Sequence, residues 1–242
     1  RRQRQMCIRD RAGPKSRNFL KKLIVSEDPD KTLSNKQFPW LSYRDIEIGM
    51  CPVRALRVAY TGELGWELHH PIEMQNYLLD ILLSSGKEFN LKLVGARAQN
   101  WLRQEKSYKA FGSDLGRDAG PFESNLSRFV DINKNFLGKD ALLKRNTDVS
   151  CVTLLIDGPK DIDPWGREAL YNETEEVMLG RLTSAGYSVH FKRSIGIGYV
   201  KSSFSEVGTK LRIKIDDAFW NAEIVRDSPY DPQNERIIDR AQ

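Results

Sequence analysis

The stretch Arg54–Pro71 reads RALRVAYTGELGWELHHP and predicts two β-strands joined by a tight turn. Gly62 and Gly65 supply the backbone freedom that such a turn needs. Both arms show the period of two that is typical of a half-buried sheet. The alternating positions are Leu56, Val58 and Tyr60 on the first arm, and Trp66 and Leu68 against Glu67 and His69 on the second.

Glu67 is the residue of this hairpin that needs an explanation. Acidic side chains are disfavoured inside strands unless water or a partner compensates their charge. The alternation leaves two interpretations open, because Glu67 either points to solvent across from Trp66 or serves a binding site. Glu63 falls in the turn, where water solvates it.

The rest of the chain predicts an α+β fold followed by a small antiparallel barrel. Helical periodicity covers Ser16–Ile24, a stretch from Met74 that ends at Gly86, and a stretch from Gly95 to Tyr108. After a linker near residues 145–148 come short strand-like runs with turn signals between them. The predicted strands are Arg44–Ile48 and Arg54–Tyr60 in the first part, and Cys151–Ile156, Val177–Ser184, Ser194–Val200, Lys210–Ile215 and Phe219–Val225 in the barrel.

Composition excludes several classes of function. The 242 residues are 40% hydrophobic and 29% charged, which suits one large or two small domains. No apolar run reaches the ~18 to 20 residues that span a bilayer, and no secretory signal is visible. The net charge of +5 comes from bases interleaved with 33 acids, without the basic stripe of a nucleic-acid surface. Such a modest positive balance suits an anionic small molecule.

The cysteines and histidines argue against a metal site. Cys7, Cys51 and Cys151 are widely spaced and form no CxxC pair, so we expect neither zinc nor a disulfide framework, and a reducing compartment. His69 and His70 are adjacent in a strand and therefore point to opposite faces.

Several segments together resemble the aminomethyltransferase family, which includes the glycine cleavage T-protein and the folate-binding regions of dimethylglycine and sarcosine dehydrogenases. The resemblance implies a partial folate-binding aminomethyltransferase fold over residues 12–145 and the family's C-terminal β-barrel over residues 146–242. It rests on motifs in the family's order: AGPKSR from Ala12, YTGELGWELHHP from Tyr60, VGARAQNWLRQEKSY from Val94, FGSDLGRDAGPFESNL from Phe111 and FLGKDALL from Phe136.

The resemblance also implies a tetrahydrofolate site. From the residues alone, Arg97 in the first turn of a helix is a cation that needs a nearby acid. In the family, the positions of Glu67 and Arg97 belong to the folate site. Tyr60, Leu68 and His69 match positions that line the same pocket in the dehydrogenase branch.

No catalytic residue is assigned, because the resemblance places the family's catalytic aspartate upstream of Ala12. Asp114 and Asp118 lie in a Gly-rich loop, where aspartate typically serves as a turn or cap residue. Residues 1–11 show neither helical nor strand periodicity, and we expect a tail or foreign sequence there.

We therefore expect the C-terminal part of an FAD-dependent dehydrogenase for an N-methylated glycine, whose bound tetrahydrofolate takes up the one-carbon unit. The FAD domain would precede this segment in the same polypeptide. The compartment expected is the cytoplasm, or the mitochondrial matrix in a eukaryote. Two alternatives remain, a glycine cleavage T-protein and a non-enzymatic regulatory relative.

Overall fold

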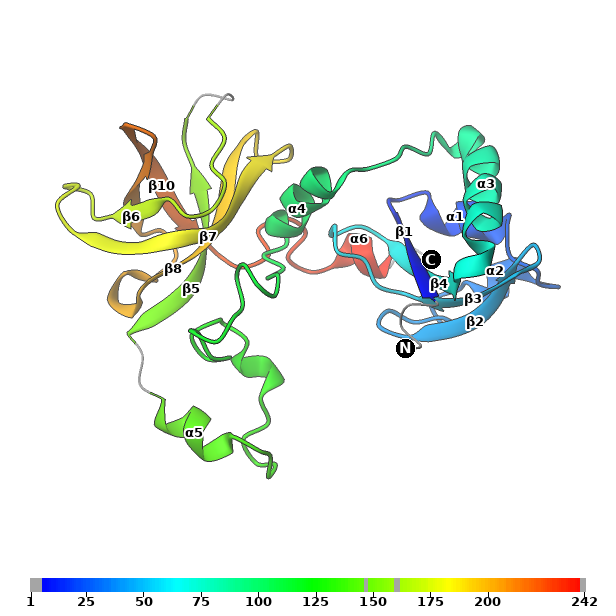
Figure 1. Cartoon of the computed structure of the whole chain (residues 1–242), viewed down its shortest axis with the longest axis horizontal. Coiled ribbons are helices and arrows are strands. Elements are labelled where there is room, and N and C mark those ends of the chain that lie inside the picture. The colour runs from blue at the N-terminus through cyan, green and yellow to red at the C-terminus, as the bar shows by residue number, and fades with distance from the viewer. Residues whose placement is uncertain (1–5, 146–147, 159–161, 240–242) are drawn as a thin grey trace. The chain divides into compact units, whose positions relative to one another are not determined.

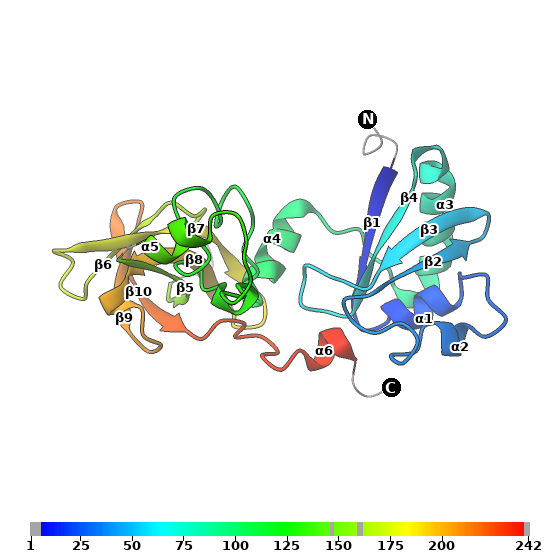
Figure 2. The same cartoon turned by 90° about the horizontal axis from the view of Figure 1, so that it is seen from below.

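The computed structural model describes residues 6–145, 148–158 and 162–239, which fall into two compact units (Figures 1 and 2). The first unit contains residues up to Gln99 together with those from Asp231 onward, and the second runs from Asn100 to Tyr230. The chain thus leaves the first unit, builds the second and returns. These units divide the chain after Gln99 and after Tyr230, not at residue 145. The division into domains at residue 145 stays a prediction.

The first unit is built on a four-stranded antiparallel sheet in the order β1-β4-β3-β2. The strands are β1 (Met6–Ala12), β2 (Tyr43–Ile48), β3 (Cys51–Leu56) and β4 (Gly65–Pro71). The helical elements are α1 (Ser16–Lys21), α2 (Pro29–Thr32), η2 (Ile72–Met74), α3 (Gln75–Gly86), η3 (Lys87–Phe89) and α6 (Glu235–Ile238). Helices α1 and α2 lie between β1 and β2 in the chain, and η2, α3 and η3 follow β4.

One face of this sheet is the core of the unit. Trp66 and Leu68 of β4 are fully buried and belong to one apolar cluster with Leu20 of α1 and Leu78 of α3. Because side chains alternate along a strand, the residues between them must face the other way. The predicted alternation of β4 is confirmed.

The hairpin itself differs from its prediction in two ways. β3 and β4 pair as expected, with Leu56 opposite Glu67, but β3 ends at Leu56 and an eight-residue loop, residues 57–64, replaces the tight turn. Arg57, the first residue after the strand, points inward like Cys51, Val53 and Ala55; it is 1% exposed and donates hydrogen bonds to backbone carbonyls.

The prediction that residues 1–11 form a tail is wrong for the part that the structure describes. Met6–Ala12 is β1, which pairs along its whole length with β4. Residues 1–5 lie outside the described residues. Whether this stretch is foreign sequence stays a prediction, and we assign no function to it.

The second unit confirms the predicted C-terminal barrel. Six strands close in the order β10-β5-β8-β7-β6-β9, and all neighbouring strands are antiparallel. The short strand β6 was not predicted, because three residues give no readable period. The strands are β5 (Val149–Ile156), β6 (Ala169–Tyr171), β7 (Met178–Ser188), β8 (Arg193–Lys201), β9 (Lys210–Ile215) and β10 (Ala218–Val225).

Helix α4 (Ala96–Glu105) leads into the barrel, and the turns η4 (Ser127–Phe129) and η5 (Ser202–Phe204) and helix α5 (Lys139–Lys144) complete the unit. Trp101 of α4 lies so close to Gly186 of β7 that a Cβ on Gly186 would come within 2.1 Å of the indole. Only glycine fits at that position, so the indole of Trp101 packs directly against the backbone of the barrel strand.

Asp114 anchors the loop after α4 to the barrel. Its carboxylate accepts hydrogen bonds from Arg103 Nη1 at 2.7 Å and from the hydroxyls of Thr183 and Ser184, both at 2.6 Å. The Arg103 and Asp114 side chains are 3% and 0% exposed. This buried ion pair with further hydrogen bonds explains Asp114 by structure alone.

Gln104 of α4 is a buried amide that finds no hydrogen-bond partner in the part of the chain that the structure describes. An unsatisfied buried polar group costs about 1–3 kcal/mol. We therefore expect Gln104→Leu, which keeps the volume and removes the amide, to raise the free energy of unfolding by about that amount. Urea denaturation followed by circular dichroism measures this, with the exposed Gln233→Leu as the matched control, expected within about 0.5 kcal/mol of the original chain. A less stable Gln104→Leu variant would contradict the prediction.

Candidate functional site

The outer face of the first unit's sheet carries two neighbouring rows of side chains that run across the strands. Strand register places Asp45, Arg54 and His69 opposite one another in one row. The next row places Leu56 opposite Glu67. The core face opposite is packed with apolar side chains, so the polar and ionisable groups of these strands gather on the outer face.

Glu67 and His69 are neighbours along β4 on this face. His69 Nε2 lies 3.2 Å from Glu67 Oε2, and the side chains are 21% and 31% exposed respectively. A carboxylate offers about four acceptor positions, and the imidazole occupies one. Glu67 therefore keeps capacity to accept hydrogen bonds from a ligand that approaches the open face.

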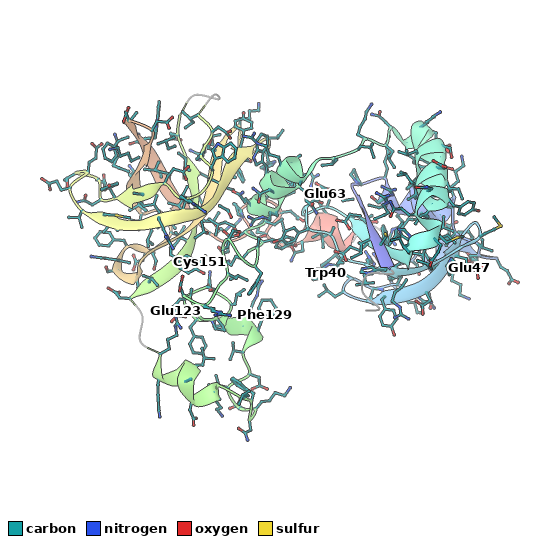
Figure 3. All side chains as sticks on the ribbon, viewed as in Figure 1. Trp40, Glu47, Glu63, Glu123, Phe129 and Cys151 are labelled. Carbon is teal, nitrogen blue, oxygen red and sulfur yellow. The ribbon has the colours of Figure 1, made fainter. Side chains whose placement is uncertain are left out.

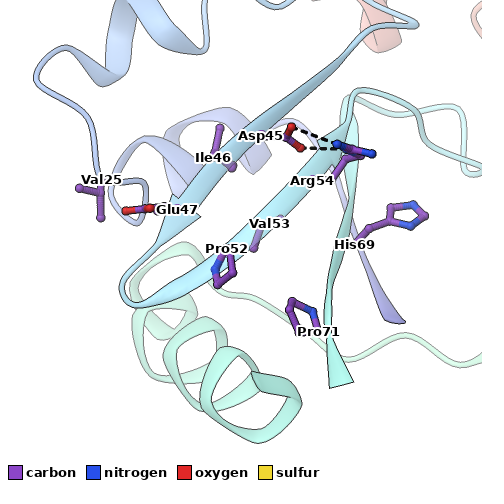
Figure 4. A pocket seen from close by; sticks show the side chains of 9 residues that line it. All are labelled: Val25, Asp45, Ile46, Glu47, Pro52, Val53, Arg54, His69 and Pro71. Carbon is purple, nitrogen blue, oxygen red and sulfur yellow. Dashed lines mark hydrogen bonds and ion pairs between the residues drawn. The ribbon is translucent and has the colours of Figure 1, made fainter. Parts of the chain in front are cut away.

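Next to this pair the face is hollowed into an open depression of about 570 Å3 between β2, β3 and β4 (Figure 4). Asp45 and Arg54 form a two-pronged ion pair at its rim, with Nε–Oδ1 and Nη2–Oδ2 distances of 2.8 and 3.1 Å. His69 also lines the depression, so the same imidazole contacts Glu67 and faces the depression. The remaining lining residues are Val25, Ile46, Glu47, Pro52, Val53 and Pro71.

The other predicted pocket residues, Leu68 and Tyr60, lie on the core face and in a loop respectively, and their role in a pocket stays a prediction. Leu68 is fully buried on the core face, so its side chain points away from Glu67. Tyr60 lies beyond the end of β3, in the loop of residues 57–64, half-buried. Glu63 lies on the same loop (Figure 3), as predicted for a turn residue.

Arg97 is placed in the first turn of α4, as predicted, with an exposed side chain. The ion pair seen for Glu67 is with His69. A direct partnership of Arg97 with the Glu67 site therefore stays a prediction.

Behind Glu67, the buried ring of Trp66 is flanked by two buried arginines. The guanidinium carbons of Arg17 and Arg57 lie 5.6 and 5.8 Å from the centre of the indole, and both side chains are 1% exposed. Burial, followed by the neighbouring charge of Arg17, lowers the pKa of Arg57 to about 10. The sequence analysis missed this arrangement, because an arginine between apolar residues is ordinarily read as a surface residue.

The remaining candidates form no second site among the described residues. The carboxylate of Asp114 is buried and accepts hydrogen bonds from Arg103 and from the barrel. Asp118 is exposed, and its backbone carbonyl accepts a hydrogen bond from Arg145. In the described ranges, no group of three His, Cys, Asp or Glu side chains is arranged to hold a metal ion. None of the helices described there is long and apolar enough to cross a membrane.

Comparison with known proteins identifies the fold and the family. Residues 2–134 match the model of the GCVT N-terminal domain, and residues 150–231 match that of the glycine cleavage T-protein C-terminal barrel domain. The chain belongs to the glycine cleavage T-protein family. The first match includes β1, and the second covers most of the closed barrel.

Members of this family with established descriptions include enzymes of two kinds. The chain is 36% identical over 225 residues to human mitochondrial dimethylglycine dehydrogenase, which covers 89% of this chain and 25% of that protein. It is 30% identical over 214 residues to an aminomethyltransferase of Caldanaerobacter subterraneus, which covers 88% of this chain and 55% of that protein. The chain therefore spans about a quarter of the dehydrogenase and about half of the aminomethyltransferase.

A solved structure confirms the architecture. The glycine cleavage system aminomethyltransferase T of Bartonella henselae superimposes with a TM-score of 0.78 over 94% of this chain and 60% of that chain, at 20% identity. The expected α+β fold of the T-protein family, with its C-terminal antiparallel barrel, is thus confirmed.

The Asp45–Arg54 pair gives a direct test of the outer face. The hydrogen bonds from Arg54 lower the pKa of the Asp45 carboxyl; desolvation opposes this shift, and the positive charge of Arg54 adds to it. Because the shift is downward, any stabilisation by the pair is present above the ordinary pKa of aspartate and is lost as the pH falls through the lowered pKa. Carbon-detected NMR titration should show the Asp45 pKa returning upward in Arg54→Gln, with Asp45→Asn used to assign the resonance. An Asp45 pKa that is the same in the original chain and in Arg54→Gln would contradict this geometry.

Proposed function

We propose that this chain is a tetrahydrofolate-binding module that transfers one-carbon units, and that it forms the C-terminal part of an FAD-dependent dehydrogenase for an N-methylated glycine. The observation that carries the proposal is Glu67, a carboxylate with spare acceptor capacity on the open face of a rigid sheet. The chain as a whole is 36% identical to a relative that is described as dimethylglycine dehydrogenase, which supports the proposal.

Glu67 suits the recognition of a reduced pterin. The ring N–H and the exocyclic amine of a pterin present two parallel donors, and a carboxylate accepts both, as an amide or hydroxyl does not. His69 fixes the orientation of the carboxylate through the contact at 3.2 Å. The strand backbone holds both groups, so the site is preorganised.

Arg97 would complete the site as a planar donor of hydrogen bonds, either to polar oxygens of the pterin or to the carboxylates of a glutamyl tail. When bound, tetrahydrofolate supplies the nitrogen that takes up the one-carbon unit as 5,10-methylene-tetrahydrofolate. An upstream FAD domain would release that unit by oxidising an N-methyl amine to an iminium. The residues of this chain bind and orient the folate.

Under this proposal the isolated chain binds folate weakly, because the family resemblance assigns part of the folate site to a segment upstream of Ala12. Calorimetric titration with 5-formyl-tetrahydrofolate measures this, with an intact relative as the comparison. Affinity equal to that of the intact relative would show that the described residues form the whole site.

Glu67→Gln in the full-length protein tests the central assignment. The substitution removes the charge and one acceptor, and we expect folate-coupled turnover to fall at least about a hundredfold, while oxidation of the amine continues and releases formaldehyde. The measurement is the ratio of methylene-tetrahydrofolate to free formaldehyde. Since Glu67 is part-exposed and its pair with His69 is worth about 0–1 kcal/mol, the melting temperature should change little. An unchanged product ratio would refute the assignment.

An aminomethyltransferase acting without flavin is the second candidate, favoured by the relative that is 30% identical and bears that description. The sequence upstream of Ala12 decides between the dehydrogenase and the aminomethyltransferase. A GxGxxG dinucleotide-binding segment there would exclude the aminomethyltransferase. A non-enzymatic regulatory relative is the third, and the presence of both Glu67 and Arg97 argues against it.

A further inference from the structure

The segment Asp231–Asp239, called here the C-terminal clasp, returns from the second unit and belongs to the first unit. Its helix α6 starts after Asp231, whose carboxylate accepts hydrogen bonds from the backbone N–H groups of Glu235 and Arg236 at 2.9 and 3.1 Å. Ile237 is 2% exposed. The clasp is therefore an ordered, packed part of the unit, although more than a hundred residues separate it from Gln99 in the chain.

Two side chains tie the clasp to the loop of residues 57–64. Arg57 donates from Nη1 to the carbonyl of Phe38 at 2.5 Å and from Nη2 to the carbonyl of Ile238 at 2.7 Å. At the far end of the loop, Arg236 pairs with Glu63 at 3.4 Å. The loop that carries Tyr60 is thus held at both ends by the last described residues of the protein.

A second connection runs from the clasp to the strand that carries Glu67. Asp239 accepts a hydrogen bond from Arg17 Nε at 3.0 Å, and its backbone carbonyl accepts one from Asn35 Nδ2 at 2.7 Å. Arg17 also donates to the carbonyl of Leu33 and to Asn35 Oδ1. Its guanidinium packs against Trp66, the residue next to Glu67.

Within the clasp, Asp239 is the residue that supplies a negative charge to the two buried arginines. Arg17 and Arg57 are both buried on Trp66. In the part of the chain that the structure describes, the hydrogen bonds of these two guanidiniums include one carboxylate, that of Asp239. A buried cation that loses its counterion must move toward water or draw water in. Either response displaces the arginines that brace Trp66 and the loop.

We propose that Asp239 is a positioning residue for the folate site: through Arg17 and Trp66 it fixes β4 and the loop of residues 57–64 in the arrangement that receives the pterin. The proposal rests on the proposed function only for the identity of the ligand. The coupling from Asp239 to the hairpin is a property of this chain's own contacts.

Asp239→Asn tests the proposal with little disturbance of the backbone. Asp239 has φ of 55°, a conformation that asparagine tolerates well, and the amide oxygen still accepts a hydrogen bond. The change therefore removes the charge alone. Glu235→Gln is the matched control, because it removes one negative charge from an exposed position of the same clasp.

Hydrogen exchange read by mass spectrometry is the first measurement on the whole chain. For Asp239→Asn, amides of residues 57–66 should exchange at least about fivefold faster, while those of β2 and of the barrel keep their rates. Exchange that is unchanged, or that rises uniformly across the first unit, would overturn the proposal, because a uniform rise indicates general stability alone. Arg236→Gln should give a smaller increase confined to the same loop.

Affinity for 5-formyl-tetrahydrofolate is the second measurement. Asp239→Asn should raise Kd about tenfold, and Glu235→Gln should leave it unchanged. An unchanged Kd in Asp239→Asn would overturn the role at the folate site. Both affinities are measured in the full-length protein. If the unaltered full-length protein binds no folate while Asp239→Asn still loosens residues 57–66, the proposed function fails and the coupling of the clasp to the hairpin stands.

Discussion

The burial of Trp66 is the constraint on which the first unit depends. β4 is the strand between β1 and β3, and its residues Trp66 and Leu68 are fully buried against α1 and α3. A slip of one residue in register would move the indole to solvent and Glu67 into the core. The cost of burying a lone carboxylate adds to the cost of exposing the indole, so the register is strongly specified. The outward direction of Glu67 is therefore a consequence of packing.

The sequence predicted what local alternation controls. The period of two on β4 correctly placed Trp66 and Leu68 inside, and short strand-like runs correctly predicted the barrel. It assigned the first arm of the hairpin wrongly, because β3 ends at Leu56 and Arg57 is buried. A pattern of hydrophobic and polar residues predicts that an arginine is exposed. No local signal shows that backbone carbonyls far away in the sequence will accept hydrogen bonds from its guanidinium.

Contacts between distant residues account for most of what the sequence did not show. Arg17 meets Asp239 across 222 positions, and Arg57 meets Ile238 across 181. The strand Met6–Ala12 is another case, since its pairing with β4 and not its own periodicity makes it a strand. The side chain of Leu68 lies on the core face, and its assignment to the pocket by family resemblance stays a prediction.

The path of the chain gives these distant contacts a functional meaning. The polypeptide leaves the first unit at Gln99, completes the barrel unit and returns at Asp231 to supply the counterion of Arg17. The two buried arginines on Trp66 therefore gain the carboxylate of Asp239 only when the chain has been made beyond the barrel. Glu67 is adjacent to Trp66, and Tyr60 lies on the loop that Arg57 begins. Under the proposal for Asp239, the geometry of the candidate site therefore depends on the clasp as well as on the hairpin itself. A ligand that binds Glu67 would in turn favour the conformation in which the clasp is closed, since any group that binds one arrangement preferentially stabilises it.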